Sequence, residues 1–163
     1  MKVDLCLKLT FALFLIALAC EPAAEVAHAQ GPPEEFTYFN EYAAGEACPF
    51  PVRVEVSGKE KLIFLPGGRI AVVSPGLKST FTNLNTGHQE KLSVAGTIRV
   101  TFLENDDAEL VLTGLNFLEG FGPPLPFLAL TIGRLNLTLD PLGNFVEPPS
   151  GSAKIIDICT LIE

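Results

Sequence analysis

The stretch "FLALTIGRLNLTLD", residues 127–140, has the period-two pattern of a β-strand with one interruption. Leucine and isoleucine occupy the even positions from 128 to 132, and leucine occupies the odd positions from 135 to 139. A strand does not change the face that it buries without an extra residue, so we expect a β-bulge or a sharp corner at Gly133. Glycine tolerates the backbone conformation that such a position requires.

Other segments alternate in the same way. "PVRVEVSG" (51–58) places three valines on one face and polar residues on the other. "GTIRVTFLE" (96–104) places Ile98, Val100 and Phe102 on a face that we expect to be buried, and a returning strand after a polar turn completes a hairpin.

Turn residues separate these segments at intervals of roughly 8–12 residues, a spacing typical of sandwiches and barrels. No helical pattern lies between them, which argues against βαβ units and a parallel sheet. We therefore expect an all-β fold, an antiparallel β-sandwich or open β-barrel of about eight to nine strands with a single disulfide. The final "KIIDICTLIE" (154–163) fits either a last strand or a helical turn.

The first 29 residues have the features of a signal peptide. "LTFALFLIALA" (9–19) carries no charge and is too short to span a bilayer as a helix, which needs about 20 residues. The small residues of "AHA" precede Gln30, which we expect to begin the mature chain. The alternative is a lipoprotein signal over residues 1–19, in which Cys20 would be lipidated and tether the domain to a membrane. Both alternatives predict export, either as a secreted protein or lipid-anchored at the outer face of the cell membrane.

Beyond this segment, we expect a linker over residues 30–47 and a single β domain over residues 48–163. Within the linker, "FTYFNEY" (36–42) holds four aromatic residues. These rings could stack on sugars or cover the edge of a sheet, and we favour the second role.

The cysteines predict one structural disulfide. Of the four, Cys6 lies in the signal peptide and Cys20 is removed or lipidated, which leaves Cys48 and Cys159 to pair in an oxidising compartment. Closing a loop of about 110 residues stabilises a fold by roughly 4–5 kcal/mol in the chain-entropy model. A zinc site needs four ligands and a thiol nucleophile needs a base, and His88 is the one histidine beyond residue 29.

The composition limits the partners. The chain has a net charge of −8, and an acidic surface repels phosphate groups, so we expect no nucleic-acid partner. Anionic membrane surfaces are disfavoured for the same reason. A membrane tether would require lipidation of Cys20.

The sequence offers few candidate catalytic residues. His88 follows a turn glycine in "TGHQEK", where an exposed loop histidine is the ordinary interpretation. No G-x-S-x-G, H-E-x-x-H, phosphate-binding or dinucleotide motif is present. We expect no catalytic residue and no cofactor.

Two further loops are candidate binding sites. In "ENDDAE" (104–109), Asp106 and Asp107 are a weak calcium candidate, but the EF-hand pattern is missing and a solvated hairpin tip explains the residues equally well. We therefore expect no metal site. In "GFGPPLPF" (120–127), the apolar residues either contact a ligand or close the open end of the fold and bury themselves. The apolar residues of that loop are Phe121, Leu125 and Phe127.

Asn136 begins the glycosylation sequon "NLT", which is relevant only if the source is eukaryotic.

The motif order "ACPFPV … GG … TNLNTG … GR … DIC", over about residues 48–163, resembles a group of small secreted proteins, mostly from actinobacteria. The resemblance implies export, a β-rich domain and the terminal cysteine pair. It implies no activity and transfers no catalytic residue.

These observations favour an exported, non-catalytic binding or interaction module for an extracellular partner or small ligand. One alternative is a β-barrel carrier of a small hydrophobic ligand, for which we expect a cavity lined by Phe64, Phe102 and Phe117. The other is a small secreted hydrolase that depends on His88.

Overall fold

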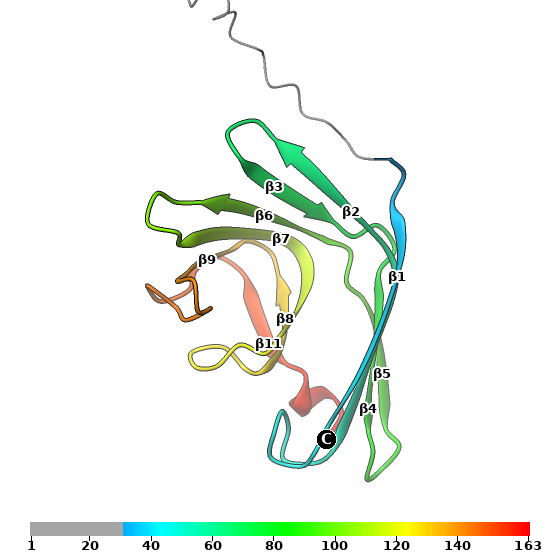
Figure 1. Cartoon of the computed structure of the whole chain (residues 1–163). Coiled ribbons are helices and arrows are strands. Elements are labelled where there is room, and N and C mark those ends of the chain that lie inside the picture. Colours follow the sequence, from blue (N-terminus) through cyan, green and yellow to red (C-terminus); the bar gives the residue numbers. More distant parts are fainter. Residues whose placement is uncertain (1–30) are drawn as a thin grey trace, which may run out of the picture.

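The computed structural model describes residues 31–163, and the expected signal segment with Cys20 and the processing site lies outside this part. The described chain forms eleven antiparallel strands and one turn of 3-10 helix (Figure 1). The elements are β1 (Glu34–Tyr42), β2 (Val52–Leu65), β3 (Arg69–Val73), β4 (Lys78–Asn83), β5 (Gln89–Ser93), β6 (Gly96–Phe102), β7 (Ala108–Glu119), β8 (Leu128–Ile132), β9 (Leu135–Leu139), β10 (Ser150–Gly151), β11 (Lys154–Asp157) and η1 (Cys159–Leu161). No helix within residues 31–163 is long and apolar enough to cross a membrane.

The strands form three sheets, which are connected because each of the two long strands, β2 and β7, belongs to two of them. Sheet I has the order β10-β9-β7-β6-β3-β2, sheet II the order β1-β2-β4-β5, and sheet III the order β7-β8-β11. The N-terminal half of β2 pairs with β1 and β4, and its C-terminal half pairs with β3. The N-terminal half of β7 likewise pairs with β6 and β9, and its C-terminal half pairs with β8. The system does not close into a barrel, because its strand order ends at unpaired edges.

The chain forms a corner and not a bulge at Gly133. Leu115 pairs with Ile132, and Leu112 pairs with Leu135, so two residues intervene on each strand and neither carries an extra one. Gly133 itself has a φ of +112°, in the region that favours glycine. β7 bends at the same level (Figure 1), and Ala129 of β8, before the corner, belongs to the same buried cluster as Leu135 and Leu137 of β9, after it.

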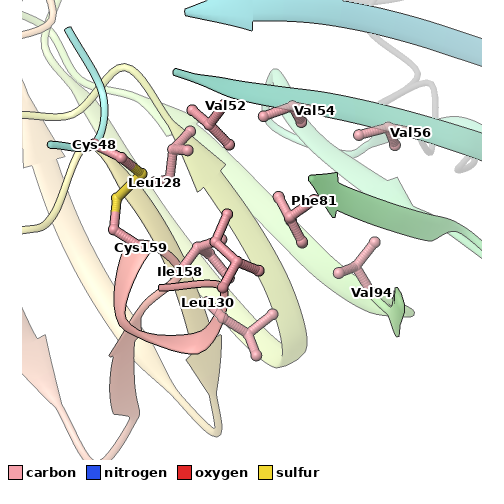
Figure 2. Packing of buried hydrophobic residues seen from close by; sticks show 11 residues of the cluster. Cys48, Val52, Val54, Val56, Phe81, Val94, Leu128, Leu130, Ile158 and Cys159 are labelled. Atoms are coloured by element: carbon pink, nitrogen blue, oxygen red, sulfur yellow. A yellow bond between two sulfur atoms is a disulfide. The ribbon is translucent and has the colours of Figure 1, made fainter. Parts of the chain in front are cut away.

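Sheets II and III pack face to face around the interlayer core (Figure 2). The valines at 52, 54 and 56 on β2 face Leu128 and Leu130 on β8, and the valines are at most 4 % exposed. The predicted alternation of β2 is therefore confirmed. The buried members of the interlayer core are Cys48, Val52, Val54, Val56, Phe81, Val94, Leu128, Leu130, Ile158, Cys159 and Ile162.

The disulfide joins Cys48, before β2, to Cys159, in η1. The two Cα atoms lie 5.5 Å apart across 111 residues of sequence, within the ordinary range for a disulfide. Both cysteines belong to the interlayer core, so the bond links sheet II to the C-terminal segment that packs on sheet III (Figure 2).

A second cluster, the loop-covered core, lies on one face of β7, β8 and β9. Leu112, Leu135 and Leu137 are buried there beneath Phe121 and Phe145 from two loops, and the two phenylalanine rings stack with centroids 5.7 Å apart. Both faces of β8 are therefore covered, since Leu128 and Leu130 belong to the interlayer core and Ala129 belongs to the loop-covered core.

The prediction of an all-β antiparallel fold with one disulfide is confirmed; the sheet system is open and has eleven strands, where about eight to nine are expected from the sequence. Three details differ from expectation. Residues 34–42, expected within a linker, form β1 along the whole N-terminal half of β2. Phe102 lies on the expected face of β6 but is 59 % exposed. The C-terminal segment contains both alternatives, the strand β11 followed by the 3-10 turn.

Candidate functional site

A hollow of about 290 Å³, the interlayer cleft, lies where the three sheets meet. Its lining comes from β1, β2, β3, β6 and the C-terminal half of β7, and most of it is apolar, including Val72, Ile98 and Phe117. The cleft is open to solvent at one side, whereas the interlayer core below it is closed.

The interlayer cleft needs Gly96 at the start of β6. A Cβ atom at this position would lie 2.1 Å from the side-chain oxygen of Asn116 and 2.7 Å from the carbonyl oxygen of Leu115. Asn116 lines the cleft, and its amide donates to the carbonyl of Thr113 at 3.2 Å. Glycine therefore allows β6 to approach β7 closely at the point where β7 turns.

The open apolar face of sheet I runs into this cleft. Side chains directly opposite each other on neighbouring strands point to the same side of a sheet, so the strand register defines two apolar rows. One row is Leu62, Val72, Ile98, Leu112 and Leu135, and the other is Phe64, Ile70, Val100, Leu110 and Leu137.

The cover over these rows decreases from β9 and β7 to β2, and the row residues on β3 and β6 are half-buried. Leu112 is fully buried at one end, whereas Leu62 is 44 % exposed and Phe64 is 43 % exposed at the other. A smaller hollow of about 180 Å³ lies at this end and shares Phe36 and Glu60 with the interlayer cleft. The open apolar face, the smaller hollow and the interlayer cleft therefore form one continuous surface.

A polar cluster lies at one end of the cleft, where β1 meets β7. Asn40 lies between Tyr38 and Tyr42 on one face of β1, and its side-chain amide donates to their hydroxyl groups at 3.0 and 2.8 Å. Both hydroxyl groups donate in turn to Oε1 of Glu119, and Asn40 donates to the same oxygen at 3.2 Å. The cluster thus fastens β1 of sheet II to β7 of sheet III.

The two tyrosines of this cluster are held in the protonated form. Burial raises the pKa of Tyr38 far above the ordinary value of 10.0, and its hydrogen bond to Glu119 raises it further. Burial and the bond to Glu119 also raise the pKa of Tyr42. Both phenols therefore remain hydrogen-bond donors at neutral pH.

The loop 120–127 packs inward. Leu125 is 4 % exposed and belongs to the loop-covered core, against which Phe121 also packs. Phe127 packs on the interlayer core, and its ring meets that of Tyr42 edge to face with centroids 5.3 Å apart. The structure thus divides these three candidate contact residues between two cores and places none of them in the lining of the interlayer cleft.

The acidic loop between β6 and β7 is a tight turn. Asp106 has a φ of +65°, and Asp107 accepts a hydrogen bond from the side chain of Asn105 at 2.5 Å. Within the described chain, no group of three or more histidine, cysteine, aspartate or glutamate residues is arranged to hold a metal ion.

His88 and Asn136 lie apart from the cleft lining. His88 is on an exposed turn with its Nε2 atom 3.9 Å from Glu90. Asn136 is half-buried on β9, where its side chain accepts from Arg134 at 3.1 Å and donates to Ser150 at 3.4 Å.

The cavity expected for a barrel carrier is not formed, because Phe64 and Phe102 lie on the open apolar face and only Phe117 lines the interlayer cleft. The sequence favours an edge-covering role for the aromatic residues at 36–42, whereas Phe36 and Tyr38 of β1 line the interlayer cleft. The spacing of Phe36, Tyr38, Asn40 and Tyr42 at every second position was the available signal. Comparison with protein-family models, with curated proteins and with solved structures found no match for this chain.

Proposed function

We propose that this protein is an exported, non-catalytic binding module that takes a small apolar ligand in the interlayer cleft. The observation that carries this proposal is the continuity between the open apolar face and the cleft. Val72 and Ile98 belong to both, since they form one row with the exposed Leu62 and also line the hollow.

Exposed apolar surface of this kind supports a binding role. Soluble proteins rarely expose large contiguous apolar patches unless these contact a ligand or partner. On sheet I the apolar side chains follow the register over three neighbouring strands, with Leu62, Phe64 and Phe102 each more than 40 % exposed. A hollow beside such a patch offers a ligand contacts on several sides, whereas the flat part of the sheet offers only one.

The disulfide supports the exported part of the proposal. Disulfides persist in oxidising compartments and are rare in cytosolic proteins. The chain has one between Cys48 and Cys159. The domain would therefore meet its ligand outside the cytoplasm.

Titration with 1-octanol, a neutral apolar probe, tests the proposal. Tyr38 and Tyr42 are the two tyrosines of the chain, which has no tryptophan, so intrinsic fluorescence reports on this region. We expect saturable binding that changes the tyrosine emission. The substitution Val72→Trp should fill the cleft and weaken binding at least tenfold, as measured by calorimetry.

Val73→Trp is the matched control, because it adds the same side chain on the opposite face of β3. We expect this variant to bind 1-octanol like the wild type. Absence of saturable binding to the wild type, or equal weakening by the two substitutions, would contradict the proposed site.

A further inference from the structure

The charges that line the interlayer cleft all have one sign. Glu60 on β2 and Glu119 on β7 contribute carboxylates, and no lysine, arginine or histidine is among the lining residues. The ion pairs within residues 31–163 are Arg53–Glu41, Lys59–Glu35 and His88–Glu90. Neither of the cleft carboxylates is therefore neutralised by a cationic side chain of the described chain.

The carboxylate of Glu119 keeps an oxygen available. Its hydrogen bonds from Tyr38, Asn40 and Tyr42 all end on Oε1, and these donors are neutral. Oε2 accepts no hydrogen bond from the described residues. The cluster therefore orients Glu119 without cancelling its charge, and the second oxygen can accept from a ligand.

Aromatic rings line the same hollow. Phe36 and Tyr38 on β1 stack with centroids 6.5 Å apart and an interplanar angle of 21°, and Phe117 contributes from β7. The face of an aromatic ring attracts cations, and aromatic sites that recognise ammonium groups use this attraction. The rings are equally suited to the apolar part of a ligand.

The volume limits the size of the ligand. At about 290 Å³, the hollow lies near the lower end of the range of about 300–1,000 Å³ that is typical of small-molecule pockets. A long lipid chain or a folded partner would not fit inside it, whereas a short alkyl or aryl amine would.

We propose that the ligand of the interlayer cleft is a small organic cation, whose ammonium group lies near Glu60 and Glu119 and whose apolar body lies against Val72, Ile98 and Phe117. This inference rests on the proposed function and adds the chemical class of the ligand. The hollow and its aromatic lining supply the site, and the unpaired carboxylates determine the charge that it selects.

Three probes with the same eight-carbon chain test the inference: octylammonium, 1-octanol and octanoate. At pH 7 and low salt, we expect octylammonium to bind at least tenfold more tightly than 1-octanol, and octanoate to bind most weakly. Added sodium chloride should reduce the advantage of octylammonium, because salt screens charge interactions. Calorimetry and tyrosine fluorescence give the affinities.

Glu60→Gln is the variant of choice, because the side-chain carboxylate of Glu60 accepts no hydrogen bond from the described residues and the substitution preserves its shape. We expect it to weaken octylammonium binding about tenfold and to affect 1-octanol binding far less. Glu55→Gln is the control, since it removes one negative charge from the outer face of the same strand. It should change neither affinity.

The outcomes separate this inference from the proposed function. Equal affinity for octylammonium and 1-octanol, a preference for octanoate, or equal effects of the two glutamine substitutions would overturn the cationic ligand while leaving an apolar site. Failure of all three probes to bind the wild type would overturn both. Because the probe series uses the wild-type protein, the inference can be rejected even if a variant does not fold.

Discussion

The rings of Phe81 and Phe117 meet edge to face with centroids 5.0 Å apart and planes inclined by 66°. Phe81 is on β4 of sheet II and Phe117 is on β7 of sheet III, so this contact joins the two layers directly below the interlayer cleft. Phe81 is fully buried, and Phe117 contributes both to the packing of the core and to the lining of the cleft.

Truncation of Phe81 should therefore be costly. We expect Phe81→Ala to lower the free energy of unfolding by about 3–5 kcal/mol, since it removes a buried ring and leaves a cavity. Phe102→Ala should cost less than about 1 kcal/mol, because that side chain is more than half exposed. Urea denaturation followed by circular dichroism gives both values. Similar losses for the two variants would contradict the interlayer packing.

The disulfide should contribute a large part of the stability. Removing it through the double substitution Cys48→Ala and Cys159→Ala should lower the free energy of unfolding by roughly 4–5 kcal/mol, because the unfolded chain then regains the freedom of a loop of about 110 residues. Chemical denaturation of the oxidised wild type and the double variant measures the difference. A wild-type protein with two titratable thiols under non-reducing conditions would contradict the bond itself.

Substitution of Ser79 should stabilise the protein. Its hydroxyl group is fully buried between Val56 and Leu92 in the register of sheet II, and it has no hydrogen-bond partner among the described residues. We expect Ser79→Ala to raise the free energy of unfolding by about 1 kcal/mol, since an unsatisfied buried hydroxyl is unfavourable.

Thr82 on the same strand provides the contrast, because its hydroxyl accepts a hydrogen bond from Gln89 at 3.0 Å. Thr82→Val should lower the free energy of unfolding by about 1 kcal/mol. Thermal and urea denaturation test the pair. A loss of stability in Ser79→Ala would show that its hydroxyl has a favourable role that the structure does not explain.

The tyrosine cluster predicts a dependence on alkaline pH. Because the folded-state pKa values of Tyr38 and Tyr42 are raised, mainly by burial and then by Glu119, folding favours the protonated phenols. This contribution is fully present below pH about 10, the ordinary tyrosine value, and is lost as the pH rises toward the folded-state values. We expect absorbance at 295 nm to show both tyrosines titrating above pH 10 in the folded protein and near pH 10 in denaturant.

Substitution of Glu119 separates the two causes of the shift. Glu119→Gln should lower the tyrosine midpoints but leave them above those of the unfolded chain, because burial remains. Glu55→Gln should leave them unchanged, since that carboxylate lies on the outer face of β2. Midpoints near 10 in the folded wild type would contradict the hydrogen-bonded cluster.

Local periodicity predicted most of the strands because half-buried strands alternate in sequence. The valines of β2 and the hairpin of β6 and β7 are examples, and the disulfide followed from the number of cysteines. Phe102 lies on the expected face, yet periodicity specifies a face and cannot say whether another layer covers it. The side of β6 that carries Phe102 is open because the loops cover β7 and β9 and do not reach this residue.

The candidate site was less predictable. The sequence predicts a linker where β1 forms, because prolines and glycine flank the aromatic residues and the pairing partner lies in a separate segment of the chain. Tyr38 and Glu119 are 81 residues apart in sequence, and no local pattern relates them. The corner at Gly133 shows the same limit, since its glycine was visible in the sequence but the absence of an extra residue required the register.

Mapping a bound probe at residue level tests the location of the site most directly. In ¹H–¹⁵N spectra of the labelled protein titrated with 1-octanol, we expect saturable shifts at residues 36–38, Val72, Ile98 and residues 116–119. The turns at residues 85–88 and 105–107 should not shift. Shifts confined to those turns, or no saturable shift anywhere, would contradict binding in the interlayer cleft.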